Sequence, residues 1–450
     1  MRVRPGEGAF ALFTDQYELS MLQSYRAEGM DGLAVFSLFV RRLPPTRNYL
    51  LACGLETVLD YLEELRFTVE DLAYLRRIEQ FSPDFLEALA DFRFAGDVFA
   101  VPEGTPVFAN EPILEVEAPI SQAQLVETFV MNQVHLATVL ASKAARVVDA
   151  ADGRAVVDFG SRRMHGIDAA LKAARAFFIA GLDATSNLLA GSLYGVPVSG
   201  TMAHSFIQAH DSEMAAFRAF ARQFPATILL VDTYDTLDGV RRVIELSREL
   251  GEVFRVRGVR LDSGDLGGLA KAARDLLDEA GLPRVKIFAS GGLDETEIAR
   301  LIAEGAPIEG FGIGTALGVS QDAPGLDIAY KLVAYEGRGR LKLSAGKPIL
   351  PGRKQVFRLE EDGRAIGDVI ARAEESLPGR PLLQPVMRAG RRLRPADPLA
   401  DMRGRAFAER ALLAPELRGL SPADPVYPVA VSACLSDYQE EVRRAVLNGA

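Results

Sequence analysis

A histidine framed by small residues is the first feature of this sequence that could do chemistry. The stretch Gly200-Thr201-Met202-Ala203-His204-Ser205-Phe206 follows an apolar, strand-like segment from Tyr194 to Ser199. A residue just past the carboxyl end of a buried strand lies at the edge where α/β barrels and open α/β sheets bind substrates. Small residues before it let the backbone approach a ligand. Because the chain has only four histidines, His204 is a candidate catalyst, with a structural hydrogen-bonding role as the alternative.

A second stretch combines an aromatic ring with two guanidinium groups. Asp158-Phe159-Gly160-Ser161-Arg162-Arg163 ends another predicted strand. Arginine is well suited to bidentate contact with a phosphate or carboxylate, and the face of a phenylalanine can stack on a planar ring. The alternative for this stretch, taken alone, is a surface arginine pair beside a core phenylalanine.

Short polar side chains follow three further predicted strands. Thr185-Ser186-Asn187 offers hydrogen-bonding groups, Asp232-Thr233-Tyr234-Asp235 offers two carboxylates, and Arg260-Leu261-Asp262-Ser263-Gly264-Asp265 offers an arginine with two more carboxylates. Carboxylates in this position can hold ribose hydroxyls, or a magnesium ion that keeps most of its water. Each aspartate, taken singly, could equally cap the helix that follows it.

The last two predicted strands end in glycine. Gly291 and Gly292 follow one strand, and Gly312 and Gly314 lie at the end of the other. Glycines after the last strands of a barrel commonly form a phosphate site, in which backbone N–H groups at a helix start hold the anion. Their spacing does not fit a dinucleotide fingerprint. Together the strand ends predict a site for a phosphorylated sugar and a flat heterocycle.

Alternating strands and helices must position these groups. Apolar residues recur at helical spacing in 167–180 and in 266–277, and Asp265 or Ser263 could cap the second of these helices. The order of elements predicts an α/β fold with a parallel sheet. We expect an irregular seven-stranded (β/α) barrel, with a doubly wound open sheet as the alternative. The seven candidate strands are 155–159, 184–187, 196–200, 227–231, 258–261, 285–289 and 308–313.

The two ends of the chain have a different character. Helices are predicted at 14–28, 54–65 and 437–447, and short strands between residues 94 and 119 and again at 330–335, 341–344 and 355–359. We therefore expect four parts: an N-terminal α/β sandwich-like module at 1–122, the barrel at 123–327, a strand-rich return at 328–375 that packs on the sandwich module, and a C-terminal extension at 376–450.

Composition limits the classes of function. The net charge of −10 argues against general nucleic-acid binding, which depends on basic surface. Two cysteines, Cys53 and Cys434, are too few for a disulfide framework or a cysteine zinc site. The chain has no apolar run of about 18 residues and no N-terminal signal pattern. These features predict a cytoplasmic protein that binds neither nucleic acid nor membrane.

In these motifs the chain resembles nicotinate phosphoribosyltransferases. The resemblance covers roughly residues 10–360 and rests on seven stretches in the family's order: Thr14-Asp15-Gln16-Tyr17-Glu18-Leu19, the stretches around Asp158, Ser186, His204, Asp232 and Asp262, and the basic loop 344–354. It implies a type II phosphoribosyltransferase with an N-terminal α/β sandwich module and an irregular seven-stranded barrel. It also implies a head-to-tail homodimer with shared active sites.

The resemblance implies a reaction. Nicotinate and phosphoribosyl pyrophosphate would give nicotinate mononucleotide and pyrophosphate in NAD salvage, in an ATP-dependent enzyme of the ligase class. His204 matches the histidine that takes a phosphoryl group from ATP, and a neutral imidazole nitrogen is a competent nucleophile near pH 7. Arg260 and Asp262 complete the implied catalytic set. The implied substrate and metal residues are Phe159 and the partner subunit's Tyr17 around the pyridine ring; Arg162, Ser186 and Thr201; Asp232 and Asp235 near the ribose; Asp232 and Asp262 near Mg²⁺, directly or through water; and Gly291, Gly292, Gly312 and Gly314 around the 5′-phosphate.

Ser186 bears on the choice of base. Nicotinamide-using relatives carry an aspartate at the matching position, which would repel nicotinate, whereas a serine hydroxyl can donate to its carboxylate. Quinolinate-using relatives are shorter and lack the histidine motif. The alternatives that stay open are a nicotinamide- or quinolinate-using enzyme, a non-catalytic protein that binds phosphoribosyl pyrophosphate or nucleotide, and an unrelated barrel enzyme acting on sugar phosphates.

The other histidines are interpreted as structural. His135 is expected to be a satisfied core residue, His165 a structural residue, and His210 a surface residue on a helix. Some relatives bind zinc through a C-terminal cysteine cluster, which this chain lacks.

Overall fold

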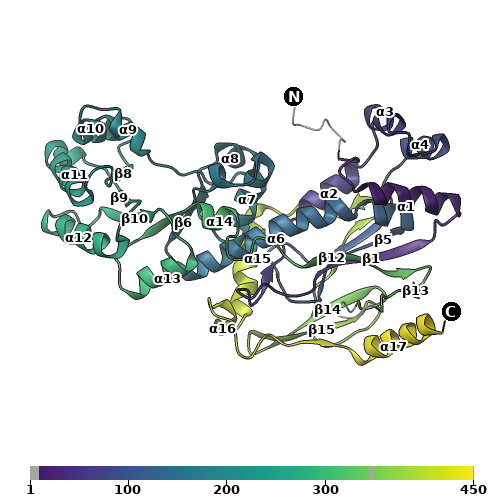
Figure 1. Cartoon of the computed structure of the whole chain (residues 1–450). Helices are drawn as coiled ribbons and strands as arrows, with labels where there is room; N and C mark the ends of the chain where they lie inside the picture. Colours follow the sequence, from purple (N-terminus) through teal and green to yellow (C-terminus); the bar gives the residue numbers. More distant parts are fainter. Residues whose placement is uncertain (1–9, 344–348, 449–450) are drawn as a thin grey trace. The chain divides into compact units, whose positions relative to one another are not determined.

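The computed structural model describes residues 10–343 and 349–448, and the chain divides into two compact units (Figure 1). Unit 1 comprises the residues up to 139 and those from 325 onward, and unit 2 comprises residues 140–324. The long helix α6 (Glu127–Ala150) contributes residues to both units. The first five residues of the predicted basic loop, 344–348, lie outside the described residues.

Unit 1 is built on a seven-stranded antiparallel sheet in the order β13-β12-β1-β5-β3-β17-β18. Strands from the beginning and the end of the chain therefore lie side by side. The strands are β1 (Leu33–Val40), β3 (Asp97–Ala100), β5 (Pro112–Pro119), β12 (Ile328–Tyr335), β13 (Arg338–Gly339), β17 (Gln384–Arg388) and β18 (Arg391–Arg392).

Two smaller sheets complete unit 1. The pair β2 (Leu50–Leu51) and β4 (Pro106–Val107) is antiparallel, and the four-stranded sheet has the order β16-β14-β15-β19. Lys354 ties the four-stranded sheet to β5, because its backbone N–H and its ammonium group both bond to the Glu115 carboxylate at 2.9 Å. The strands are β14 (Lys354–Glu361), β15 (Arg364–Arg372), β16 (Arg380–Pro381) and β19 (Val429–Val431).

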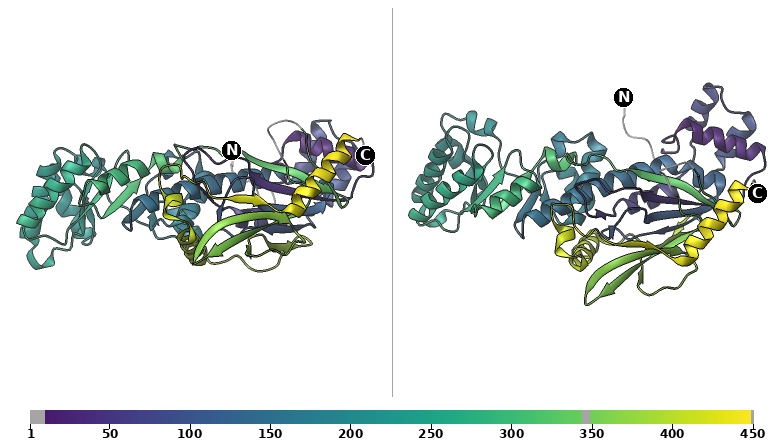
Figure 2. Two further views of the ribbon diagram at one scale, coloured as in Figure 1. Left: turned by 90° about the horizontal axis from the view of Figure 1, so that it is seen from below. Right: turned by 60° about the horizontal axis from the view of Figure 1, so that its bottom comes forward.

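Helices cover these sheets, and one apolar core fills the space between. The core contains residues of β1, β5, α2 and α6, together with Leu435 of the C-terminal helix. That helix, α17, packs against β15, and Figure 2 shows it in yellow beside the green strands. The helices are α1 (Gln16–Ala27), α2 (Leu55–Glu64), α3 (Val69–Arg77), α4 (Pro83–Ala90), α5 (Ile120–Leu125), α15 (Leu399–Leu412), α16 (Pro415–Arg418) and α17 (Ala433–Leu447).

Unit 2 contains a parallel six-stranded sheet in the order β7-β6-β11-β10-β9-β8. The strands are β6 (Ala155–Asp158), β7 (Ala184–Thr185), β8 (Ile228–Leu230), β9 (Gly258–Leu261), β10 (Lys286–Ser290) and β11 (Gly310–Ile313). The helical segments are η1 (Ser161–Arg163), α7 (Ile167–Ala180), α8 (Leu188–Tyr194), α9 (His204–Gln208), α10 (Glu213–Gln223), α11 (Thr236–Leu250), η2 (Gly251–Val253), α12 (Leu266–Glu279), α13 (Glu295–Ala303) and α14 (Thr315–Gly318).

The α/β class and the parallel sheet are confirmed, and six of the seven predicted strands form within two residues of their predicted bounds. The seventh, 196–200, contributes only an isolated parallel bridge between Val198 and Thr185. Pro197 lacks an N–H group, which limits pairing there, and the preceding residues form helix α8 instead of extending a strand. The sheet is therefore a curled half-barrel with an irregular edge at β7.

The other element predictions agree with the structure at most positions. Helix α7 has the predicted bounds, and Asp265 caps α12 by accepting from the Gly268 N–H at 3.2 Å. The predicted strand 341–344 is wrong in its described part, because residues 341–343 are not paired in a sheet. The predicted C-terminal helix begins four residues earlier than expected, since Ser432 caps it.

No helix in the described part of the chain is long and apolar enough to cross a membrane. Both cysteines are free thiols, with Cys53 buried and Cys434 exposed.

Candidate functional site

The strand order of unit 2 brings the predicted site residues to one edge. Because all six strands are parallel, their carboxyl ends meet at the same edge of the sheet. We call the residues at or just after these ends the rim. It comprises Phe159 after β6, Ser186 after β7, Asp232 after β8, Arg260 and Asp262 at β9, Gly291 and Gly292 after β10, and Gly312 and Gly314 at β11.

His204 lies beside the rim as the first residue of α9. Its Nδ1 is 3.1 Å from the hydroxyl of Thr233, and its Nε2 is 3.7 Å from Oδ2 of Asp262. The imidazole is 39% exposed, so a ligand can reach it. His204 is thus held between a hydroxyl and a carboxylate from two different strand ends.

Two carboxylates share one network. The backbone N–H of Asp262 and the hydroxyl of Ser263 both donate to Oδ2 of Asp232, at 2.9 and 2.7 Å. The hydroxyl of Ser290 donates to Oδ1 of Asp262. The second oxygen of Asp232, Oδ1, is buried and has no hydrogen-bond partner among the described residues. Buried polar atoms are nearly always paired, so this oxygen marks a place for a ligand group.

Arg260 extends from β9 across the rim. Its guanidinium donates to the hydroxyl of Thr201 at 2.7 Å and to the carbonyl of Met202 at 3.2 Å, whereas its Nε is buried without a partner among the described residues. Burial lowers the pKa of Arg260, the nearby carboxylates of Asp262 and Asp232 oppose this shift, and the positive charge of Arg162 adds to it. The group still carries its charge at neutral pH, so it can bind an anion.

Phe159 forms an aromatic wall with Phe288. Their ring centroids are 6.1 Å apart at an interplanar angle of 48°, and the Arg260 guanidinium lies 5.8 Å from the Phe159 centroid. Gly312 lies against both rings, and a Cβ at this position would collide with the Phe159 ring. Gly312 is therefore required for close packing at the position where the sequence predicted a phosphate loop.

The loop after β10 needs glycine for its backbone. Gly291 and Gly292 have φ angles of +87° and +67°, and a Cβ at Gly291 would collide with the carbonyl oxygen of Asp262. Helix α13 follows, and its first residue, Glu295, is buried against Lys143 and Arg146. This ion-pair cluster holds the start of the helix in place next to the glycine loop.

Several predicted residues have other positions or an additional role. Asp235 caps α11 by accepting from the Asp238 N–H at 2.8 Å. Helix capping was the alternative to ligand binding that the sequence left open for this aspartate. Ser186 and Arg162 are exposed. Tyr17 lies on α1 in unit 1, is 49% exposed and forms no part of the unit 2 rim. The ligand roles of these four residues stay predictions.

The structure confirms only some of the predictions for the other three histidines. The prediction that His135 is hydrogen-bonded is confirmed, since its Nε2 accepts from the Leu326 N–H at 2.9 Å, but the residue is half-buried and not fully in the core; burial lowers its pKa. The prediction for His210 is wrong in its location, because the residue follows α9 in a turn, where its Nδ1 lies 2.7 Å from the Phe206 carbonyl. His165 is exposed.

Three hydroxyl residues of the site were not among the predicted site residues, although Ser263 was considered as a helix cap. Thr233 contacts His204, Ser290 contacts Asp262, and Ser263 contacts Asp232. Each is adjacent in sequence to a predicted site residue, so a hydroxyl beside a strand-end carboxylate or glycine is the signal that could have found them. The pairing of Ser290 with Asp262 depends on β9 lying next to β10, which the sequence alone does not specify.

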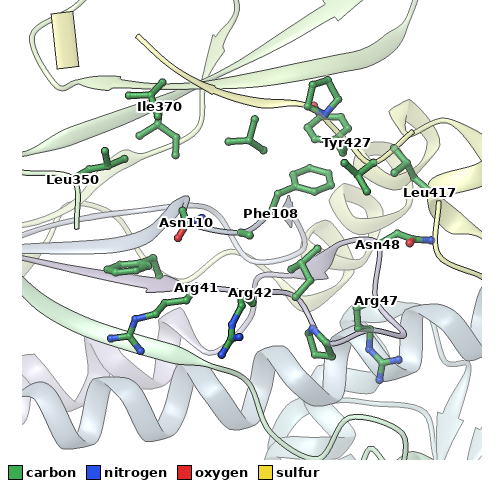
Figure 3. Close-up of a pocket in the computed structure, with 18 of the residues that line it drawn as sticks. Arg41, Arg42, Arg47, Asn48, Phe108, Asn110, Leu350, Ile370, Leu417 and Tyr427 are labelled. Carbon is green, nitrogen blue, oxygen red and sulfur yellow. The ribbon is translucent and has the colours of Figure 1, made fainter. Parts of the chain in front are cut away.

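A cavity of about 890 Å³ lies elsewhere, inside unit 1 (Figure 3). Its wall is mostly apolar and includes Phe108, Ile370 and Tyr427. The guanidinium groups of Arg41 and Arg42 lie on the opposite side of the cavity from Ile370 and Tyr427 (Figure 3), and both bond to Asp327, at 3.0 and 3.1 Å. Polar side chains, among them Arg47, Asn48 and Asn110, also line the cavity, but it contains none of the predicted site residues.

A family comparison agrees with the geometry of the rim. Residues 12–135 match the model of the nicotinate phosphoribosyltransferase N-terminal domain, and residues 154–356 match that of the nicotinate phosphoribosyltransferase family. The chain is 60% identical over 433 residues to nicotinate phosphoribosyltransferase pncB2 of Mycobacterium tuberculosis, covering 96% of this chain and 93% of the relative. It is 42% identical over 381 residues to nicotinate phosphoribosyltransferase of Bacillus subtilis, covering 82% and 78%.

A solved structure is also similar. The crystal structure of human nicotinic acid phosphoribosyltransferase superposes with a TM-score of 0.85 at 30% identity, covering 96% of this chain and 99% of the human chain. The sequence motifs, the parallel half-barrel and these matches lead to one conclusion: the chain belongs to the nicotinate phosphoribosyltransferase family.

Proposed function

We propose that this chain transfers the phosphoribosyl group of phosphoribosyl pyrophosphate to nicotinate, giving nicotinate mononucleotide and pyrophosphate in NAD salvage. The observation that best supports this is the incomplete bonding at the rim. Asp232 Oδ1 and Arg260 Nε are buried without partners among the described residues, next to His204 and Asp262. A ligand hydroxyl could donate to Asp232 Oδ1, and a ligand phosphate could accept from the N–H of Arg260 Nε, so a ligand that carries both groups would satisfy both atoms.

The rim can stabilise the charges that form in this reaction. The bond between ribose C1 and the pyrophosphate oxygen lengthens first, so positive charge builds on the ribose and negative charge on the leaving group. The carboxylates of Asp232 and Asp262 favour the cation, and the guanidinium groups of Arg260 and Arg162 favour the departing pyrophosphate. The pyridine nitrogen of nicotinate then forms the new bond with its own lone pair. It carries no proton at neutral pH, so no general base is required.

Nicotinate is proposed to stack on Phe159 and to accept a hydrogen bond from the hydroxyl of Ser186. A hydroxyl can donate to a carboxylate, whereas an aspartate at this position would repel it. Phe159 and Ser186 follow neighbouring strands, β6 and β7, which supports a shared pocket for the base.

Magnesium is proposed as the cofactor. The unpartnered Oδ1 of Asp232 and the nearby Asp262 carboxylate are oxygen donors of the type that Mg²⁺ prefers. Three or more His, Cys, Asp or Glu side chains do not gather into a metal site anywhere in the described ranges. Asp232 and Asp262 would therefore hold the ion together with water and substrate oxygens. Bound there, magnesium would neutralise charge on the pyrophosphate.

His204 is proposed to couple the reaction to ATP. With Nδ1–H donating to Thr233, Nε2 carries the lone pair and can attack the terminal phosphorus of ATP, releasing ADP. Water later cleaves the N–P bond and regenerates the imidazole. Asp262 lies 3.7 Å from this nitrogen, so phosphorylation would place new negative charge beside a carboxylate that is proposed to hold magnesium. This proximity supports a link between phosphorylation and substrate binding.

A homodimer with shared sites is proposed because Tyr17 belongs to unit 1. Tyr17 lines a pocket of about 390 Å³ with the carboxylates of Asp15 and Glu127, whereas Arg162 is exposed at the unit 2 rim. These opposite charges would attract in a head-to-tail pair. Exposed apolar residues in both units offer further contact area; they are Phe10 and Phe13 in unit 1, and Leu188, Leu189, Leu193 and Val198 in unit 2.

A cytoplasmic location is proposed, because the two free thiols fit a reducing compartment.

The test is product formation by the purified protein with phosphoribosyl pyrophosphate and magnesium, offering nicotinate, nicotinamide or quinolinate, with and without ATP. We expect nicotinate mononucleotide from nicotinate, formed faster with ATP. Use of nicotinamide or quinolinate instead would overturn the assigned base while keeping the site. Binding of phosphoribosyl pyrophosphate without transfer to any base would favour a non-catalytic binding protein.

A further inference from the structure

Asp158 is a buried carboxylate to which the proposed reaction gives no role. It ends β6, is fully buried, and both of its oxygens are occupied. Oδ1 accepts from the backbone N–H of Gly160 at 2.7 Å, and Oδ2 accepts from the hydroxyl of Thr185 at 2.7 Å. The two donors come from different segments, so the carboxylate joins the turn after β6 to the end of β7.

On the β7 side, this bond fixes the backbone around Ser186. The hydroxyl of Thr185 donates to Asp158 and also accepts from the Asn187 N–H at 3.1 Å. The Ser186 N–H donates to the backbone carbonyl of Asp158 at 2.8 Å. Ser186 is thus held at its own amide and by the residues on either side of it, while its side chain stays exposed.

On the β6 side, the same carboxylate fixes the turn that carries Phe159. The Phe159 N–H donates to the Ile313 carbonyl at 2.8 Å, and the next N–H, that of Gly160, donates to Asp158. A Cβ at Gly160 would press against the carbonyl of Gly314 and against the Asp158 carboxylate itself. The turn is therefore tightly closed, and the aromatic ring projects from a fixed backbone.

A buried charge at this position has an energetic cost. Burial raises the pKa of Asp158, and the hydrogen bonds from Thr185 and Gly160 oppose that shift. Carboxylates are normally excluded from a protein interior unless they are hydrogen-bonded. An apolar residue would fill the same space, but it would leave the Gly160 N–H and the Thr185 hydroxyl without this shared acceptor.

We propose that Asp158 and Thr185 are positioning residues that determine selectivity for the base, because together they fix Phe159 and Ser186 relative to one another. This inference rests on the proposed function, in which Phe159 stacks on nicotinate and Ser186 bonds to its carboxylate. Both positioning residues are buried and hydrogen-bonded within the protein, so they would act on the substrate through Phe159 and Ser186. Loosening their bond would let the stacking face and the carboxylate donor move apart, while the carboxylates proposed to bind ribose and magnesium, at β8 to β10, keep their own network.

The experiment compares Thr185→Val, which removes the hydroxyl at nearly constant volume, with Thr185→Ser, which keeps it. We expect Thr185→Val to raise the KM for nicotinate about 10-fold or more. This is the size expected when the displaced Ser186 hydroxyl no longer donates to the charged carboxylate of nicotinate. The KM for phosphoribosyl pyrophosphate should stay within about 2-fold, and the preference for nicotinate over nicotinamide should fall. Thr185→Ser should retain wild-type selectivity.

A matched control separates positioning from general destabilisation. Thr138→Val removes another fully buried threonine hydroxyl, which bonds to the Cys53 carbonyl at 3.1 Å in unit 1. It should lower Tm to a similar extent without changing either KM. If Thr185→Val does not fold, Asp158→Asn is judged by the same pair of KM values.

The experiment separates failure of the positioning role from failure of the proposed function. A wild-type protein that does not use nicotinate would overturn the proposed function itself. A wild-type protein that uses nicotinate, with Thr185→Val or Asp158→Asn leaving the nicotinate KM and the base preference unchanged, would overturn the positioning role alone. An equal rise in both KM values would also overturn it, because the effect would then not be confined to the base.

Discussion

The unit 1 cavity and the unit 2 rim differ in how their polar groups are arranged. The cavity has about 890 Å³ and a mostly apolar wall; the guanidinium groups of Arg41 and Arg42 pair with Asp327, and the buried Nε atom of Arg41 has no partner among the described residues. The rim gathers carboxylates, an arginine and a histidine from separate strand ends, and leaves Asp232 Oδ1 and Arg260 Nε unpartnered. A large volume can arise wherever two sheets pack imperfectly, whereas unpaired polar groups that converge at one edge have a free-energy cost that a ligand can recover.

The buried charges of the two units show the same difference. In unit 1, Arg358 is fully buried and bonds to both oxygens of Asp368, at 3.0 and 2.7 Å, and Tyr427 donates to the same carboxylate at 2.8 Å. This network is closed and serves stability. In unit 2, the network of Asp232 and Asp262 is open on the side of His204. Four predictions test this distinction, from the largest expected effect to the smallest.

Replacing His204 by alanine should abolish ATP stimulation and leave slow, ATP-independent transfer. The imidazole is the only group beside Asp262 that is proposed to accept a phosphoryl group, so its loss removes the coupling but not the ribose and base contacts. Product formation with and without ATP measures the effect, and labelled ATP reports phosphorylation of the protein. His210→Ala is the matched control and should behave like wild type. Full ATP stimulation in His204→Ala would contradict the assigned role.

Asp368→Asn should destabilise the protein without changing kinetics in the folded fraction. Removing one partner of a buried ion pair typically costs about 3–5 kcal/mol. Here we expect the lower end of that range, because burial and the Asp368 carboxylate raise the pKa of the neighbouring Glu111, which could ionise in the variant and compensate Arg358. Denaturant unfolding measures the change. Glu249→Gln, in the exposed pair with Arg218, should cost less than about 1 kcal/mol. A lower kcat in folded Asp368→Asn would contradict the prediction that this unit 1 network serves stability alone.

Glu18→Gln should flatten the pH dependence of stability. Burial raises the pKa of Glu18 to about 8, with a smaller opposing effect from the Thr128 hydroxyl. Between the unfolded value near 4.5 and about 8, the folded state holds a proton that the unfolded state has lost, so stability falls as pH rises.

Glutamine imitates the protonated carboxyl, so the variant should match wild type near pH 5 and exceed it near pH 8. We expect a difference of a few kcal/mol, because Glu18 is fully buried and a pKa difference of one unit corresponds to about 1.4 kcal/mol. Tm measured across this pH range tests it. Parallel pH profiles for the two proteins would show that Glu18 does not titrate there.

Ala109→Leu, which partly fills the unit 1 cavity, should leave transfer unchanged within about 2-fold and shift stability by less than about 1.5 kcal/mol. The comparison predicts this near-null result because the cavity holds no group that the proposed reaction uses. Kinetics with nicotinate and Tm measure it. Loss of transfer in a folded Ala109→Leu protein would show that the unit 1 cavity, and not only the rim, takes part in the reaction.

Much of the site could be predicted because it depends on local pattern. Apolar periodicity located α7 and six strands that are followed by polar or glycine residues, and the identity of each strand-end residue restricted its chemistry. The failures have physical causes. The segment 196–200 lost its strand because Pro197 cannot donate and the residues before it form α8. Asp235 has a cap role that its residue type alone left open.

The sequence by itself determined the α/β order, the bounds of α7 and the residue types at the strand ends, since these follow from short-range periodicity and hydrogen-bonding capacity. Only the tertiary structure decided which strand ends are neighbours. The placement of β11 between β6 and β10 brings Gly312 against Phe159, and that of β9 beside β10 brings Ser290 to Asp262. Strand pairing over long sequence separation depends on the packing of the whole sheet, and no local propensity encodes it.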